Sequence, residues 1–132
     1  MRVMVTGSRN WTDNNPVFRK LEFLEPFKDI LILGDASGVD AIALKYATLN
    51  KIQYRLFRAD WNRWGKAAGP KRNREMVDNG RPDVVVGFRN YGISPGTDDA
   101  LSYAKSRGIP VVIYRIVLEV ENEEALSTLR SS

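Results

Sequence analysis

Two residue types are missing from this 132-residue sequence, cysteine and histidine. Without cysteine the chain can form no disulfide bridge, no thiolate zinc site and no cysteine nucleophile. Without histidine it lacks the most frequent general base and the imidazole on which serine triads depend. Any catalysis must therefore rest on carboxylates, and we expect no metal site.

Long apolar runs are also missing, since none approaches the roughly 18 residues that a membrane span requires. The opening residues, MRVMVTG, lack the apolar segment of a signal peptide. Hydrophobic residues make up 43% and charged residues 27% of the chain, which is typical of one globular domain. We expect a single domain over residues 1–132, a cytoplasmic location and no membrane contact.

Positive charge is concentrated in one part of the chain. The net charge is +4, yet residues 51–75 hold eight Lys or Arg against two acids, whereas the tail from residue 116 holds four Glu against one Arg. A concentrated positive field attracts phosphate-bearing partners, either small molecules or polymers.

Short apolar runs alternate with helical patterns along the chain. Buried strands are predicted at the most continuous apolar runs, which are 3–5, 30–33, 54–57, 84–86 and 111–114. Helices are predicted from the spacing of apolar residues and from capping signals: from an N-cap at Asn15 to a stop at Pro26, over 39–50, from Pro70 to Gly80, and from an N-cap at Thr97 to Gly108.

Strands alternating with helices through five repeats predict an α/β fold, a Rossmann-like doubly wound three-layer domain. Its mainly parallel sheet is expected to have five or six strands, with the core in residues 1–114. Residues 115–132 form a C-terminal extension that is expected to add an edge strand and a short helix. Ligands bind such sheets at the carboxyl ends of the strands, so the loops after the strands are the candidate sites.

The loops after the first two strands carry small residues. Thr6, Gly7 and Ser8 offer small side chains and backbone N–H groups, and Arg9 adds a guanidinium for a phosphate or carboxylate. A plain turn with a surface arginine is the alternative. Gly34 and Gly38 let the backbone approach a ligand at a helix N-terminus.

Neither loop matches the dinucleotide fingerprint or the P-loop, so no such cofactor is expected. Asp40 lies in the first turn of the helix that follows. It is either an acid that faces the ligand or a residue that stabilises the positive end of the helix.

The helix that follows Pro70 opens with cations. Residues three and four apart share a helix face, so Arg72 and Asn73 turn inward with Met76 and Val77, while residues 71, 74 and 75 turn toward water. Burying Arg72 and Asn73 without partners would be costly. Either an anionic ligand from outside satisfies them, or Arg72 pairs with an acid of the same chain, namely Asp35, Asp40 or Asp98.

The loop after the fourth strand is rich in small and hydroxyl-bearing residues. Gly92, Ser94, Gly96 and Thr97 form a turn that suits a phosphate or a ribose. Residues 92–96 fit the G-x-S-x-G pattern, but no histidine is present to deprotonate Ser94, so a hydrolase triad is excluded. Asp98 and Asp99 are the nearest acids, with either a catalytic role or a role at the positive helix end.

Trp61 and Trp64 precede the basic helix closely. Aromatic rings beside cations are typical of a lid or of a surface on which a base stacks. Ordinary packing within the loop is the alternative.

Taken together, the segments TGSR, GDASGVDA, WGKAAGPKRNREM and GISPGTDDALSYAKSRGIPV resemble the YspA, cpYpsA-related branch of the SLOG superfamily. The resemblance covers about residues 1–114. The superfamily also includes the LOG nucleotide phosphoribohydrolases and the DNA-processing protein DprA. The resemblance implies a Rossmann-like fold, a pocket for nucleotides or their derivatives with the glycine loops at the phosphate and ribose, and a homo-oligomer.

The chain departs from the phosphoribohydrolase pattern P-G-G-x-G-T-x-x-E. Ile93 and Ser94 replace the double glycine, and Ala100 stands at the position of the catalytic glutamate. The resemblance makes Arg72 the counterpart of the catalytic arginine. A substitute carboxylate would have to come from one of four acids, which are Asp35, Asp40, Asp98 and Asp99.

We therefore expect a phosphate-bearing, nucleotide-derived small ligand, bound by residues of all four loops: Gly7, Ser8, Arg9, Gly34, Asp35, Gly38, Asp40, Arg72, Asn73, Ser94, Gly96 and Thr97. The chain would sense or sequester this ligand, or hydrolyse a nucleoside monophosphate at its N-glycosidic bond with Arg72, Asp98 and Asp99 as candidate catalytic residues. The alternatives are a protein that binds single-stranded nucleic acid and a non-catalytic interaction module.

Overall fold

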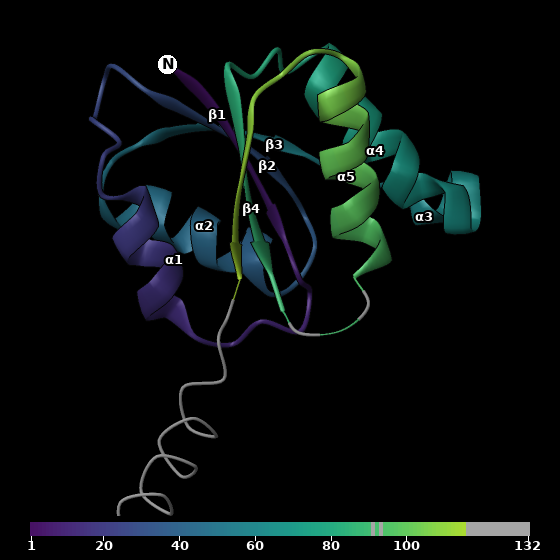
Figure 1. Cartoon of the computed structure of the whole chain (residues 1–132), viewed down its shortest axis with the longest axis horizontal. Helices are drawn as coiled ribbons and strands as arrows, with labels where there is room; N and C mark the ends of the chain where they lie inside the picture. The colour runs from purple at the N-terminus through teal and green to yellow at the C-terminus, as the bar shows by residue number, and fades with distance from the viewer. Residues whose placement is uncertain (91, 93, 116–132) are drawn as a thin grey trace, which may run out of the picture.

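The structure is a computed structural model that describes residues 1–90, 92 and 94–115. Five strands form one parallel sheet in the order β3-β2-β1-β4-β5 (Figure 1). Their bounds are Arg2–Gly7 for β1, Ile30–Gly34 for β2, Gln53–Phe57 for β3, Val84–Arg89 for β4 and Val111–Arg115 for β5. These are the five strands that the apolar runs predict. The edge strand and helix expected after residue 115 lie outside the described residues.

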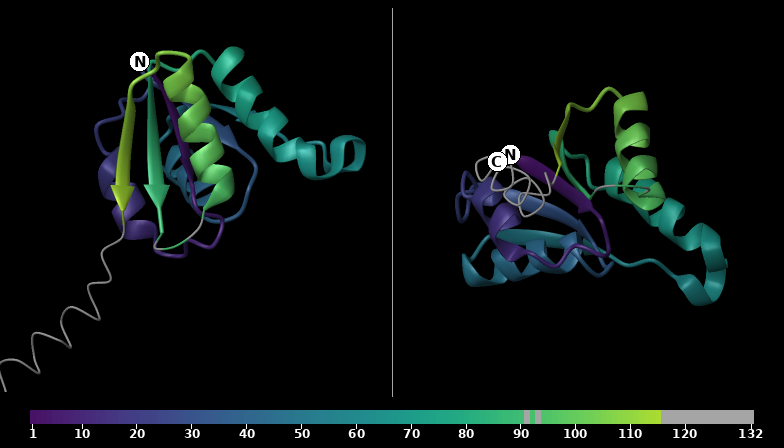
Figure 2. Two further views of the ribbon diagram at one scale, coloured as in Figure 1. Left: turned by 45° about the vertical axis from the view of Figure 1, so that its right-hand side comes forward. Right: turned by 60° about the horizontal axis from the view of Figure 1, so that its bottom comes forward.

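Four helices cover the two faces of the sheet. On one face lie α1 (Asn14–Leu21) and α2 (Val39–Leu49), and on the other lie α4 (Ala68–Asp78) and α5 (Pro95–Ser106) (Figure 1). A short helix α3 (Trp61–Trp64) and a 3-10 turn η1 (Gly65–Ala67) stand at the N-terminal end of α4, outside these layers (Figure 2). The result is the predicted three-layer, Rossmann-like α/β fold.

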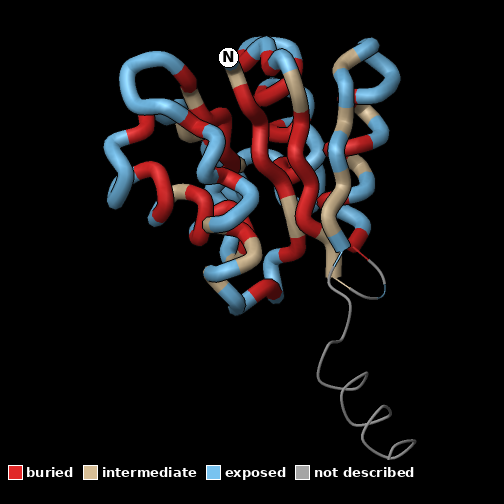
Figure 3. The backbone as a smooth tube through the Cα atoms, turned by 60° about the vertical axis from the view of Figure 1, so that its left-hand side comes forward, coloured by how far each residue is buried: buried red, intermediate tan, exposed pale blue. Residues whose placement is uncertain are grey.

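The three central strands, β1, β2 and β4, are mostly apolar because helices cover both faces of the sheet there, whereas the edge strand β3, predicted as buried, exposes Gln53, Tyr54 and Arg55. Successive side chains of a strand point to opposite faces. Val3 and Val5 accordingly belong to the core cluster on the side of α1 and α2, whereas Met4 belongs to the cluster on the side of α4 and α5. The central strands form the most deeply buried part of the chain (Figure 3).

The topology places a crevice between β1 and β4. The chain runs outward from β1 through β2 to β3, then crosses back and continues from β4 to β5. The connections after β1 and β4 therefore lead to opposite faces of the sheet, although the strands are paired up to Gly7 and Phe88. This divergence is the topological switch point at which open α/β sheets bind ligands.

Several predicted helix boundaries are wrong. Asp13, not Asn15, caps α1, because its carboxylate accepts a hydrogen bond from the Asn15 N–H, and the helix ends at Leu21 rather than near Pro26. Ser94, not Thr97, is the N-cap of α5. The helix begins at Pro95, because a proline fits the first helical position, where an N–H group would have no partner within the helix.

The helix expected from Pro70 begins at Ala68. Its first turn accommodates Pro70 because the N–H groups there need no partner within the helix. Within the described part of the chain, no helix has the length and apolarity needed to cross a membrane.

Candidate functional site

A cavity of about 370 Å³ opens at the carboxyl edge of the sheet, at the switch point between β1 and β4. This volume lies in the range of small-molecule sites, about 300 to 1,000 Å³. The lining comes from the end of β1 and the loop after it, from the loop after β2 and the start of α2, from α4, and from the N-cap and first turn of α5: Thr6, Gly7, Ser8, Arg9, Asn10, Ala36, Asp40, Arg72, Asn73, Ser94, Pro95, Gly96 and Thr97.

The loop after β1 is held firmly against its neighbours. The Ser8 N–H donates to the carbonyl of Phe88 and the Val39 N–H donates to the carbonyl of Ser8, both at 3.1 Å. The amide of Asn90 donates to the Ser8 hydroxyl at 3.1 Å. A Cβ on Gly7 would come within 2.6 Å of the Phe88 carbonyl. Only glycine therefore allows this loop to pack so closely beside β4.

Arg9 is the cation most available to a ligand. Its side chain is exposed and lines the cavity, and it takes part in none of the ion pairs among the described residues. The Ser37 hydroxyl donates to the Arg9 carbonyl at 3.0 Å. This bond ties the loop to the start of α2, whose N-cap Gly38 has no capping side chain. A guanidinium beside an uncapped helix start favours an anion.

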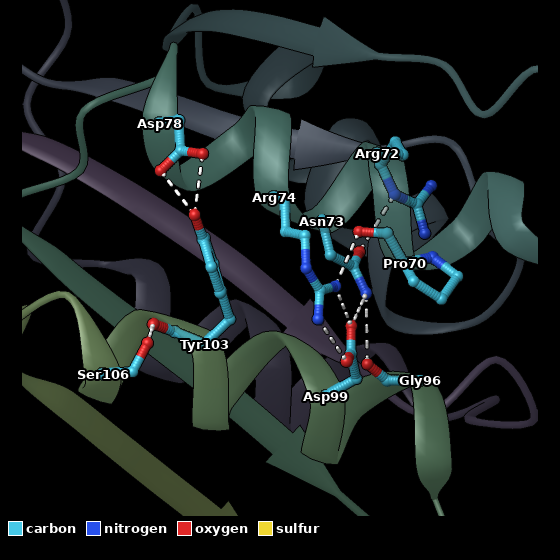
Figure 4. A network of polar contacts seen from close by, with 9 residues as sticks. All are labelled: Pro70, Arg72, Asn73, Arg74, Asp78, Gly96, Asp99, Tyr103 and Ser106. Carbon is cyan, nitrogen blue, oxygen red and sulfur yellow. Dashed lines mark hydrogen bonds and ion pairs between the residues drawn. The ribbon is translucent and has the colours of Figure 1, made fainter.

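Arg72 and Asn73 turn inward as predicted, with exposed fractions of 7% and 5%. The Nη1 of Arg72 lies 2.7 Å from the Oδ1 of Asp35, and its Nε donates to the Asn73 Oδ1 at 3.1 Å. The Asn73 amide donates to the Gly96 carbonyl at 3.3 Å (Figure 4). The hypothesis that these side chains need an external anion is therefore wrong, and the alternative of an internal acid, Asp35, is confirmed.

The guanidinium of Arg72 nevertheless remains part of the cavity wall. Its Nη2 has no hydrogen-bond partner among the described residues, whereas Nε and Nη1 are occupied. A Cβ on Gly34 would come within 2.7 Å of both the Arg72 Nη1 and the Asp40 Oδ2. Gly34 does not line the cavity but creates the space in which the two charged groups meet.

Among the described residues, Asp40 is the one acid of the cavity lining, and it is only 5% exposed. Its Oδ2 accepts a hydrogen bond from the Ala36 N–H at 3.1 Å. Burial raises the pKa of the Asp40 carboxyl to about 6, although Arg72 and the Ala36 N–H favour the charged form. The cavity therefore contains a carboxyl group whose charge changes close to neutral pH.

The two predicted catalytic acids of α5 do not line the cavity. Asp98 accepts hydrogen bonds from the guanidinium of Arg89 at 2.9 and 3.1 Å, and these bonds hold the pKa of Asp98 below its usual value. Asp99 forms an ion pair with Arg74 at 3.1 Å (Figure 4). Both carboxylates are thus occupied by arginines outside the lining.

The start of α5 forms the opposite wall. Ser94 and Thr97 are buried, and Ser94 makes no side-chain capping bond, so α5 also presents an uncapped N-terminus. A Cβ on Gly96 would meet no atom within 4 Å, so glycine there leaves the entrance open. Ala100, at the position of the glutamate in the phosphoribohydrolase pattern, is fully buried in the core.

Nine of the twelve expected binding residues line the cavity. The other three, Gly34, Asp35 and Gly38, do not line it but contact residues that do. Thr6, which the sequence also indicates in the loop after β1, lines the cavity, whereas sequence reasoning missed three lining residues, Asn10, Ala36 and Pro95. All three adjoin residues that were singled out, so an extension of each loop by one position would have found them. Trp61 and Trp64 do not line the cavity.

The fold and the cavity define a Rossmann-like α/β domain with a ligand-sized site at its switch point. The chain belongs to the YspA, cpYpsA-related SLOG family, whose pattern matches residues 1–64. It is 38% identical over 119 residues to the Gene 61 protein of Mycobacterium phage D29. This match covers 84% of this chain and 94% of that protein.

One solved structure with a similar fold is DNA processing protein A (DprA) from Streptococcus pneumoniae, with a TM-score of 0.56 and 17% identity. The match covers 84% of this chain but only 58% of that one. At this identity the likeness shows a shared fold.

Proposed function

We propose that the chain binds a phosphate-bearing small ligand derived from a nucleotide, in the cavity at the switch point. The observation that carries this proposal is the guanidinium of Arg9, which has no ion-pair partner among the described residues, at a ligand-sized cavity that two uncapped helix starts border. A phosphate between Arg9 and the starts of α2 and α5 would be neutralised by the guanidinium and by the helix dipoles.

The remaining lining suits the uncharged part of such a ligand. Ser8, Asn10 and Thr97 carry hydroxyl and amide groups, and the carboxyl of Asp40 accepts hydrogen bonds. The free Nη2 of Arg72 provides a second donor for an anion or a carbonyl. A sugar with several hydroxyl groups could exchange its hydrogen bonds with water for bonds to these groups.

Binding without turnover is the role that the lining supports best. Cleavage of an N-glycosidic bond passes through an oxocarbenium-like transition state that requires a nearby carboxylate. Asp98 and Asp99 are engaged by arginines, and Asp35 is paired with Arg72. Asp40 is the carboxylate left to face the ligand, and burial disfavours its charged form. We therefore favour a sensor or sequestering protein over a phosphoribohydrolase.

Isothermal titration calorimetry with a panel of nucleoside monophosphates tests the proposal. We expect at least one member to bind and the matching nucleoside without phosphate to bind at least about tenfold more weakly, which corresponds to about 1.4 kcal/mol. Arg9→Ala should lower the affinity for the nucleotide by a similar factor. Arg19→Ala, which removes an exposed cation of α1 that does not line the cavity, is the matched control and should have no effect.

Two results would contradict the proposal. One is the absence of binding across the whole panel, and the other is equal affinity of the wild type and Arg9→Ala. Chromatography of the same mixtures for free base checks the enzymatic alternative, for which release of base by the wild type and its loss in Asp40→Asn would be the signature.

A further inference from the structure

A second feature of the surface lies outside the cavity. The segment of α3 and η1, residues 61–67, which we call the Trp arm, is exposed at every position and contains two tryptophans. Trp61 and Trp64 are 47% and 43% exposed. The arm stands clear of the layered body at the end of α4 (Figure 2). Adjacent exposed aromatic rings of this kind mark interaction sites more often than scattered single ones.

The arm is ordered by local contacts, although none of its residues is buried. Asp60 caps α3 by accepting a hydrogen bond from the Arg63 N–H at 3.1 Å. Gly65 has a φ of 54°, which lets the chain turn from α3 into η1. A Cβ on Gly69 would come within 3.3 Å of the Trp61 ring, so this ring lies against the first turn of α4. The Trp61 ring is therefore held in place rather than free.

Two cations lie over the Trp64 ring, and the basic residues around the arm have no acidic partners among the described residues. Four basic residues occupy positions 58–71, against the single acid Asp60, which is engaged as a helix cap: Arg58, Arg63, Lys66 and Lys71. All four are exposed, and none takes part in an ion pair among the described residues. The Nζ of Lys71 and the guanidinium of Arg63 lie 4.0 and 4.7 Å from the centroid of the Trp64 ring.

We propose that the Trp arm binds a single-stranded nucleic acid, with bases stacked on Trp61 and Trp64 and phosphates held by the flanking cations. Aromatic faces that alternate with free cations bind single strands without a requirement for sequence, because every base has a face that stacks. The cores of protein–protein interfaces are depleted in lysine, whereas here lysine lies over the ring itself. The charge and the rings together fit a strand better than a protein surface.

The test uses the full chain and fluorescence anisotropy with a labelled oligothymidylate strand at low salt. We expect the strand to bind. Trp61→Ala and Trp64→Ala should each lower the affinity for the strand by about tenfold. Trp64→Phe should retain most of the affinity because a phenyl ring still stacks. Phe23→Ala and Phe27→Ala remove exposed aromatics on the connection between α1 and β2 and should change nothing.

The salt dependence tests the role of the cations. Each phosphate contact with a single strand contributes about 0.7 to the slope of log K against log salt, so Arg63→Gln with Lys66→Gln should reduce the slope by about 1.4. Lys45→Gln with Lys105→Gln is the matched control, since these exposed lysines lie on α2 and α5. Its slope should equal that of the wild type.

Three outcomes would overturn the inference: no binding of the strand, equal affinity of the wild type and both Trp→Ala variants, or arm variants that change only self-association in sedimentation velocity. The inference is independent of the small-ligand site. Arg9→Ala should leave strand binding intact, and the arm variants should leave nucleotide binding in the cavity intact.

Discussion

Asp40 and Arg72 show how single residues determine the character of the cavity. Both are buried side by side over Gly34, where any side chain would collide with them. Asp35 takes the ion pair with Arg72, so Asp40 keeps only the Ala36 N–H as a direct partner among the described residues. A buried carboxyl without an ion pair of its own is costly to ionise, and its pKa rises.

We predict that Asp40→Asn stabilises the protein at neutral pH. The folded-state pKa of about 6 exceeds the usual 3.8, so the wild type loses stability as pH rises from about 4 to 6, because the folded state must give up a proton that it binds more tightly. The full difference corresponds to about 3 kcal/mol. Urea unfolding should show Asp40→Asn to be more stable at pH 7.5 and nearly equal to the wild type at pH 4.

Asp98→Asn is a control with the opposite sign. Arg89 holds the pKa of the exposed Asp98 below its usual value, so this carboxylate contributes stability at neutral pH that is lost as pH falls through its folded pKa.

A less stable Asp40→Asn at pH 7.5 would contradict the prediction for Asp40. It would mean that the attraction between Asp40 and Arg72 outweighs the cost of burial.

The inward direction of Arg72 and Asn73 could be predicted from helical spacing alone. The partner of Arg72 could not, because all three candidate acids lie near the same sheet edge: Asp35 in the loop after β2, and Asp40 and Asp98 in the first turns of α2 and α5. Asp35 follows β2 directly, and its carboxylate also accepts a hydrogen bond from the Ala59 N–H at 3.2 Å. That contact orients it toward α4, and it depends on how two loops distant in sequence pack.

At the scale of elements, the starts of α2 and α5 border the cavity but tolerate change differently. Gly38 has a φ of 73°, and a Cβ there would collide with the carbonyl of Ser8. Gly96 lies in the first turn of α5, where a Cβ would meet open space. One glycine fixes the position of a helix, whereas the other leaves room at its end.

We therefore predict that Gly38→Ala destabilises the protein by at least about 2 kcal/mol, since the backbone conformation and the collision both oppose a side chain. Gly96→Ala should change stability by less than about 0.5 kcal/mol. Urea denaturation of both variants measures the difference. Equal stabilities would show that the loop after β1 and the start of α2 move apart freely.

The existence of the helices could be predicted, but their starts could not be placed reliably. Several residues near each start can act as a cap, and tertiary packing selects among them. Asp13 rather than Asn15 caps α1, and Pro95 places the start of α5 before Thr97. Helix α3 was missed because four residues that bury nothing leave no apolar periodicity in the sequence.

At the scale of the whole molecule, the strands were predictable because a parallel sheet covered on both faces leaves continuous apolar runs. The spatial order β3-β2-β1-β4-β5 cannot be read from those runs, since it depends on where the chain crosses back. That crossing creates the switch point, and with it the one arrangement that brings the loops after β1, β2 and β4 to a common cavity.

The most direct test of the central claim, that this cavity holds a phosphate-bearing nucleotide derivative, is an NMR titration of the backbone amides with the monophosphate that binds best in calorimetry. The account predicts that the largest shifts fall on residues 7–10, 38–40 and 96–97, around Arg9 and the two helix starts, while the Trp arm remains unchanged. Shifts confined to the Trp arm or to the opposite edge of the sheet would contradict it.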